Sequence, residues 1–187
     1  MKLQPGDLFA TNGDSLLSKA IRVIQWWWSS DNEATYNHVG IYIGAAGIRE
    51  ITKWVDEEKT LEARWRFREF LLKDYLDRPI LIVRHNKMTL IRFYMGIKAI
   101  QKDLDNIYPV WRLPLHLLHV AKVFAFGPGV CSEQTGKFMK GAGFMNVVYG
   151  ITPDNLADRW RIDRDMTIIF EGVLTQEVLS KLTGGAE

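Results

Sequence analysis

The feature that most constrains the fold is a tight turn that leads directly into a helix-compatible run. The turn is Gly127-Pro128-Gly129, and the run extends from Ser132 to about Lys140. Cys131 lies at the junction and is the only cysteine in the chain. Unpaired backbone N–H groups and the positive end of the helix dipole at such a junction favour the thiolate, the reactive form of cysteine. A single cysteine also excludes an intramolecular disulfide, so no such cross-link can hold this fold together.

The hydrophobic patterning predicts one α+β domain over residues 1–187. Predicted strands join mostly as hairpins and predicted helices lie toward both ends, which favours α+β over an alternating α/β arrangement. Strands are expected at residues 8–10, 36–44, 48–55, 79–84, 122–126 and 167–170. Helices are expected at residues 14–28, 89–104, 132–140 and 174–182, with a short one opened by Thr152-Pro153-Asp154.

Two segments, residues 48–55 and 56–78, lie between the predicted strands at residues 36–44 and 79–84. Residues 48–55 are expected to return beside residues 36–44 as a hairpin, with its turn at residues 45–47. The charged segment 56–78 carries interleaved aromatic residues, and a helix or an irregular excursion is expected there.

The composition indicates the class of protein and limits the kinds of partner that it can bind. A chain of 187 residues, 47% apolar and 25% charged, is long enough to bury a core and is unlike a disordered chain. A net charge of +2 argues against a nucleic-acid partner. We find neither an apolar leader nor an apolar run of about 18–20 residues, so we expect a cytoplasmic protein with no integral membrane segment. Action on a cell wall would then need release by lysis or a phage particle. The oligomeric state is left open.

Cys131 and His38 have the residue types of a cysteine nucleophile and its base. His38 lies in a predicted strand far upstream of the cysteine. A hairpin turn at residues 45–47 would pair positions near residue 42 with Glu50, and a carboxylate there could orient the imidazole. The structural alternatives stay open: an inert buried cysteine, a structural histidine and a glutamate that is only an edge-strand charge.

Further polar and aromatic residues are candidates for the walls of the site. Asp7 and Tyr36 are expected to bind substrate, and Trp27 belongs to a run of three tryptophans that is either core or an aromatic wall for an acyl chain, a sugar or a membrane interface. The pair His116 and His119 has metal-ligand spacing but no matching acid pair. Neither a metal nor an organic cofactor is expected.

Five short motifs, taken in order, resemble those of a known group. The motifs are Gly6-Asp7-Leu8, residues 37–44, Arg49-Glu50-Ile51, Val130-Cys131-Ser132-Glu133 and residues 152–156. Their order resembles the circularly permuted branch of the NlpC-type papain-like cysteine hydrolases, the YiiX-like group, which is related to the lecithin:retinol acyltransferase type. In that branch the histidine precedes the cysteine, as it does here.

The resemblance implies a permuted papain-like fold, in which a small antiparallel sheet packs against a helix that carries the nucleophile at its N-terminus. It implies a triad of Cys131, His38 and Glu50 that cleaves an amide or ester bond through an acyl-enzyme intermediate. The implied partner is a small-molecule, peptide or lipid substrate, such as a peptidoglycan-type amide or a lipid amide. An acyltransferase of the same fold and a catalytically decayed binding module are the alternatives. Gln134-Thr135 replaces the aliphatic pair that is usual after the cysteine motif.

Overall fold

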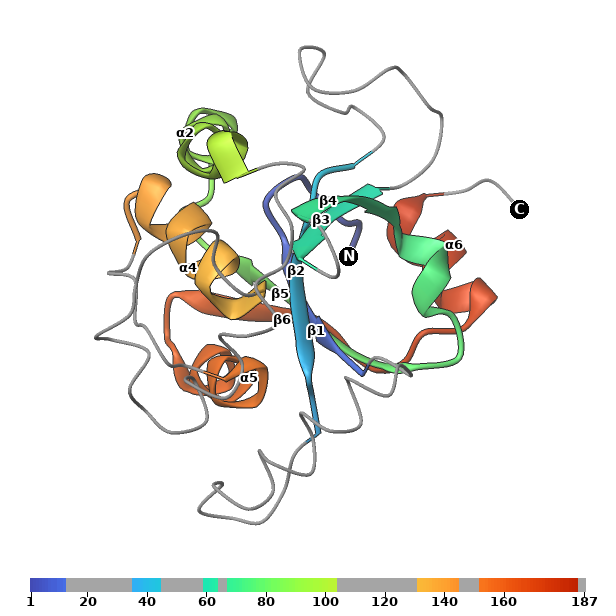
Figure 1. Cartoon of the computed structure of the whole chain (residues 1–187). Helices are drawn as coiled ribbons and strands as arrows, with labels where there is room; N and C mark the ends of the chain where they lie inside the picture. The colour runs from blue at the N-terminus through green and yellow to red at the C-terminus, as the bar shows by residue number, and fades with distance from the viewer. Residues whose placement is uncertain (13–34, 45–58, 64–66, 104–130, 145–151, 185–187) are drawn as a thin grey trace.

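A twisted antiparallel sheet with helices on both faces forms the centre of the structure (Figure 1). The structure is a computed structural model, and it describes residues 1–12, 35–44, 59–63, 67–103, 131–144 and 152–184. Within these residues the sheet has six strands in the order β4-β3-β2-β1-β5-β6. The strands are β1 (Leu8–Thr11), β2 (His38–Tyr42), β3 (Lys59–Ala63), β4 (Phe67–Leu71), β5 (Pro79–His85) and β6 (Met166–Val173).

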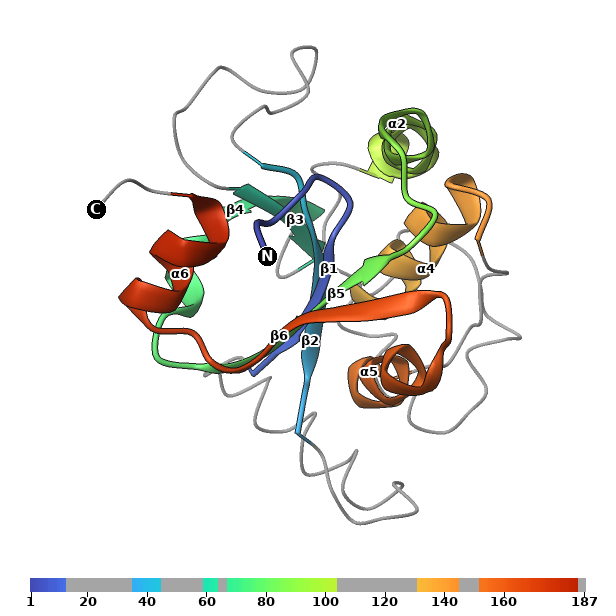
Figure 2. The ribbon, with the colours of Figure 1, turned by 180° about the vertical axis from the view of Figure 1, so that it is seen from behind.

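The helices form separate layers on the two faces of the sheet. Figures 1 and 2 show α2, α4 and α5 on one face and α6 on the other. The α-helices are α2 (Leu90–Ile100), α4 (Cys131–Gly141), α5 (Pro153–Ile162) and α6 (Gln176–Thr183), and the 3-10 helices are η1 (Leu72–Tyr75) and η2 (Gln101–Asp103).

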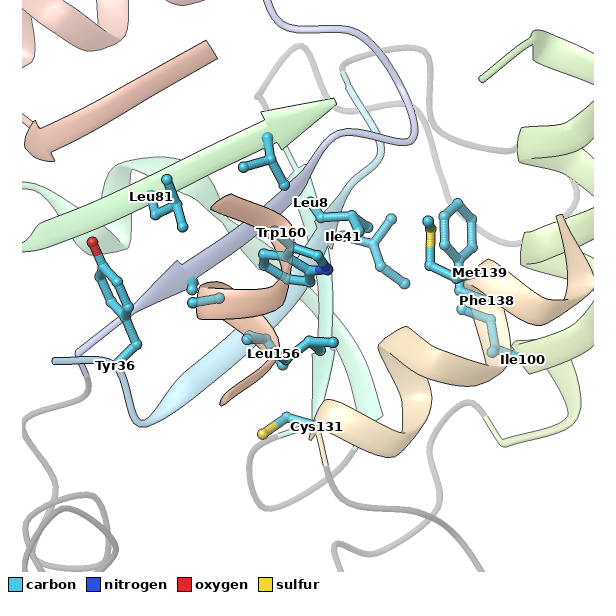
Figure 3. Packing of buried hydrophobic residues seen from close by; sticks show 14 of the residues in the cluster. Leu8, Tyr36, Ile41, Leu81, Ile100, Cys131, Phe138, Met139, Leu156 and Trp160 are labelled. Atoms are coloured by element: carbon cyan, nitrogen blue, oxygen red, sulfur yellow. The ribbon is translucent and has the colours of Figure 1, made fainter. Parts of the chain in front are cut away.

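Alternation of side chains along β1 and β2 creates two cores. Leu8 and Ile41 face the first core, which lies under α2, α4 and α5 (Figure 3). Phe9 and Tyr42, each one residue further along, face the second core, which includes residues of η1 and α6. Successive residues of a strand point to opposite faces, so a sheet covered on both faces needs apolar residues at almost every position.

Local signals set the starts of several helices. Thr152 caps α5, where its hydroxyl accepts a hydrogen bond from the N–H of Asn155 at 3.2 Å, and Pro153 follows as the first helical residue. This start was predicted from the sequence, because proline at this position loses no helical hydrogen bond. Thr89 caps α2 in the same way, through the N–H of Arg92 at 3.3 Å.

The structure corrects the prediction for residues 56–78. Two strands, β3 and β4, and the helix η1 occupy described parts of this segment. Tyr42 pairs with Thr60 of β3 on one side, and on the other its N–H donates to the carbonyl of Asp7 at 2.8 Å. The expected pairing of positions near residue 42 with Glu50 is therefore wrong. The predicted elements at 14–28, 48–55 and 122–126 lie outside the described residues.

Two glycines allow α2 and α4 to approach closely. A Cβ atom on Gly96 would lie 2.6 Å from the Phe138 ring, and a Cβ atom on Gly141 would lie 3.2 Å from the Cα of Gly96. These distances leave no room for larger side chains at the crossing. The predicted α+β class, with an antiparallel sheet packed against a helix that begins at Cys131, is confirmed.

Candidate functional site

Cys131 is the first residue of α4, and its side chain lies at the edge of the first core (Figure 3). It is 6% exposed, and its cluster includes Leu156 and Trp160 of α5. Its carbonyl accepts a hydrogen bond from the Thr135 hydroxyl at 3.1 Å. The first N–H groups of a helix have no partner inside the helix, so this end of α4 presents donors and a partial positive charge.

The first turns of α4 are polar but buried, and an ion pair anchors them. Residues 132–135 are each no more than 1% exposed. Asp103 of η2 accepts hydrogen bonds from Gln134 Nε2 at 3.0 Å and from Lys137 Nζ at 2.8 Å. Burial raises the pKa of Asp103, but these hydrogen bonds outweigh burial and hold the pKa below its usual value. The anchor fixes α4, and with it Cys131, relative to the end of α2.

His38 begins β2, the strand against which α4 packs, but its ring turns away from Cys131. The ring stacks on Tyr75, with centroids 6.3 Å apart and planes inclined by 19°. Tyr75 belongs to the second core, whereas Cys131 belongs to the first. Val39, the next residue of β2, faces the first core instead. The structure thus places the predicted base on the strand next to the nucleophile, with its side chain on the opposite face of the sheet.

The other members of the expected set fall in different places. Glu50 and Trp27 lie outside the described residues, so their roles stay predictions. Glu62 of β3, which was not among the predicted site residues, pairs with Gly40, two residues along β2 from His38. It was missed because residues 56–78 were not predicted to contain strands.

Asp7 is engaged in a buried ion pair. Its carboxylate is 1% exposed and accepts hydrogen bonds from Arg84 Nε at 2.7 Å and from Arg84 Nη2 at 2.8 Å. Burial raises the pKa of Asp7 and outweighs the opposing effect of Arg84, while the carboxylate raises the pKa of Arg84. Asp7 precedes β1, whereas His38 pairs with Thr11 at the far end of that strand. The structure therefore does not bring Asp7 to His38.

Tyr36 is the one described substrate-binding candidate that shares a core with Cys131. Its hydroxyl donates to Glu171 at 3.4 Å, and the Arg161 guanidinium carbon lies 5.4 Å from its ring centroid. Burial and the carboxylate of Glu171 raise the pKa of Tyr36 to about 12, so the phenol stays protonated. Its backbone N–H donates to Asp154 Oδ1 at 2.9 Å. Tyr36 thereby links the chain before β2 to α5 and β6.

His85 forms a second aromatic cluster away from this site. Its ring stacks on Phe144 at a centroid distance of 3.7 Å, and the Arg92 guanidinium lies 4.7 Å from the centroid of Phe144. Its Nδ1 accepts a hydrogen bond from the N–H of Lys87 at 3.1 Å. Burial lowers the pKa of His85, although nearby Asp165 opposes this effect.

We expect this buried histidine to make the protein less stable in mild acid. Its pKa is about 6.5 in the unfolded chain and lower in the folded protein, so the unfolded chain binds more protons as pH falls through this range. The contribution of His85 is complete above about pH 6.5 and declines as pH falls toward the folded pKa. His85→Phe should reduce the loss of stability between about pH 7.5 and pH 5, measured by urea unfolding at each pH. An unchanged pH dependence would contradict this role, and Lys181→Gln, an exposed change on α6, is the control.

Comparison with known proteins supports the fold more than the chemistry. The described elements define an α+β protein with an antiparallel sheet and a helix headed by its only cysteine. The metalloprotein yiiX from Escherichia coli O157:H7 has a similar structure, with a TM-score of 0.59 and 16% sequence identity over 93% of this chain and 100% of that chain. No protein-family model and no curated protein matches the sequence. The YiiX-like part of the resemblance is therefore supported as a fold, while the papain-like hydrolase assignment is not.

Proposed function

We propose that this protein is a cysteine hydrolase that uses Cys131 to cleave an amide or ester bond. The observation that carries the proposal is the position of the only cysteine in the chain. It begins an 11-residue helix that packs against the strand headed by His38. The positive end of the helix dipole at this terminus can stabilise both an anionic nucleophile and the oxyanion formed at the attacked carbonyl.

In the proposed reaction, the Cys131 thiolate attacks the carbonyl carbon of the substrate. The carbon–nitrogen or carbon–oxygen bond then breaks, and the leaving group takes a proton from His38. Water attacks the resulting thioester, His38 accepts the water proton, and the acid leaves as the thiolate re-forms. Peptides of the cell-wall type and lipid amides are the proposed substrate classes. An amine or alcohol in place of water would make the same site an acyltransferase.

Catalysis by this pair requires a change of backbone conformation at the start of β2, because the His38 side chain stacks on Tyr75 on the face of the sheet opposite Cys131. His38 is half-buried and is the first residue of β2. A non-catalytic binding module is the second candidate function, and the stacking of His38 on Tyr75 in the opposite core favours it.

The similar E. coli structure is described as a metalloprotein. Within the described ranges of this chain, no group of three or more His, Cys, Asp or Glu side chains could hold a metal ion. No metal takes part in the proposed steps.

Alkylation of Cys131 by iodoacetamide tests the proposed pair. In the wild type, labelling at about pH 6 should be fast compared with that of a small free thiol under the same conditions. His38→Ala should slow this labelling at least about tenfold, because the imidazolium that stabilises the thiolate is lost. His85→Phe, which removes a histidine from the separate cluster, should leave the labelling rate unchanged. Slow labelling at about pH 6 in both the wild type and His38→Ala would reject the hydrolase in favour of the binding module.

A further inference from the structure

Helix α2 exposes a continuous apolar surface. Its outer face consists of Leu90, Ile91, Tyr94 and Met95, whose exposed fractions lie between 50% and 74%. These residues are spaced as i, i+1, i+4 and i+5, so they form one patch over two turns. The opposite side of α2, which includes Phe93 and Ile97, is buried in the first core. Contiguous apolar patches on a protein surface mark interaction sites more often than single exposed residues do.

Positive charge borders this outer face. Lys98 is exposed and lies seven residues after Ile91, on the same side of the helix. Lys140 of α4 is also exposed. The next residue, Gly141, lies against α2, since a Cβ atom there would be 3.1 Å from the carbonyl oxygen of Met95. Lys98 and Lys140 therefore lie near the C-terminal part of the apolar patch.

The carboxylates of the same helices are withdrawn from the surface. In α2, η2 and α4 the acidic residues are Asp103 and Glu133. Asp103 is 7% exposed and paired with Lys137, and Glu133 is fully buried. The exposed charged residues of these three helices are therefore basic. An apolar patch bordered by lysines complements a surface that is apolar inside and negatively charged at its rim.

We propose that α2 is an interfacial helix that docks the protein on an anionic lipid surface. In amphipathic interfacial helices, apolar side chains enter the boundary between headgroups and acyl chains, and lysines contact the anionic headgroups. Tyrosine, here Tyr94, is enriched at this depth of the bilayer. The 11 residues of α2 span about 16 Å, so the helix lies along the surface. In the described part of the chain, no helix is long and apolar enough to cross a membrane.

Vesicle flotation with the full chain tests the docking surface. The wild type should float with vesicles that contain about one third phosphatidylglycerol, and should stay unbound with vesicles of phosphatidylcholine alone. Lys98→Gln combined with Lys140→Gln should weaken binding roughly 25-fold, because each lysine near such a surface contributes about fivefold. Ile91→Glu combined with Met95→Glu should weaken binding at least about tenfold, since the apolar contact is lost.

Two control variants test whether flotation depends on the outer face of α2 or on exposed residues in general. Ile162→Glu changes an 81% exposed isoleucine on α5, and Lys181→Gln changes an exposed lysine on α6. Both should float like the wild type. Circular dichroism should show an unchanged Tm for every α2 variant, so that a loss of flotation reports on the surface.

Three outcomes would overturn the lipid assignment. They are equal binding to both kinds of vesicle, wild-type flotation of the α2 variants, and absence of flotation by the wild type. Sedimentation velocity would then show whether the face is covered by a second copy, as a dimer that Ile91→Glu dissociates. The inference is independent of the proposed chemistry, because Cys131→Ser should abolish hydrolysis and leave flotation unchanged.

Discussion

Replacement of Arg84 by leucine is expected to lower the free energy of unfolding by about 3–5 kcal/mol, because it leaves a buried carboxylate without its partner. Asp7 is 1% exposed and receives two hydrogen bonds from the guanidinium of Arg84. It also accepts a hydrogen bond from the N–H of Gln4 at 2.8 Å. The raised pKa of Asp7 shows that burial already opposes its charge even with Arg84 in place. Urea unfolding at neutral pH measures the effect.

Removal of the charge should rescue much of this loss. Asp7→Asn combined with Arg84→Leu eliminates the unpaired carboxylate and keeps an acceptor for the N–H of Gln4. The double variant should therefore be more stable than Arg84→Leu alone. In Arg84→Leu, protonation of Asp7 in acid should also recover stability, because the neutral carboxyl tolerates burial. A double variant as unstable as Arg84→Leu would show that Arg84 acts through packing and its hydrogen bond to the Lys2 carbonyl.

Truncation of Phe138 to alanine is expected to cost about 3–5 kcal/mol. The ring is fully buried, meets Phe93 edge-on at a centroid distance of 6.1 Å and lies against Gly96. The glycine allows the backbones to approach, so the ring fills the space between α2 and α4. Its removal leaves a cavity in a place where neither helix can easily move closer. Thermal and urea unfolding should both report the loss.

Two further substitutions calibrate this result. Phe138→Leu keeps most of the buried volume, so it should cost clearly less than Phe138→Ala. Tyr94→Ala removes an aromatic ring of α2 that is 50% exposed, so it should change stability by less than about 1 kcal/mol. If Phe138→Ala were as mild as Tyr94→Ala, the packing of α2 on α4 would contribute little to stability.

The sequence predicted the elements whose signals are local. The strand at residues 79–84 is a continuous apolar run, as expected for β5, which is paired on both sides. The start of α5 follows from Thr152 and Pro153, whose effects depend only on the neighbouring backbone. The strands β3 and β4 were missed because their sequences are charged, and β4 lies at the edge of the sheet. Edge strands carry charged residues that obscure the pattern, and their conformation depends on the neighbouring strand.

The candidate site was predictable only in part, for the same reason. Cys131 was placed correctly at the start of a helix, because the sequence Gly127-Pro128-Gly129 before it is a local signal. The side-chain direction of His38 depends on the register of β2, and a shift of one residue exchanges the two faces of a strand. The sequence pattern around His38 is apolar on both faces and does not fix this choice. The expected neighbour Glu50 rested on a hairpin that the pairing of Tyr42 with Thr60 rules out.

The strand order has a consequence for synthesis of the chain on the ribosome. The short strand β1 joins the two parts of the sheet, because it lies between β2 and β5. Leu8 pairs with Val83, so β1 emerges roughly 75 residues before its second partner. At a synthesis rate of about 5–20 residues per second, Val83 is added roughly 4–15 s after Leu8, so one edge of β1 has no partner strand during that time. During this interval the N–H and C=O groups along that edge of an apolar strand lack their final partner, which is a condition that favours pairing with other chains.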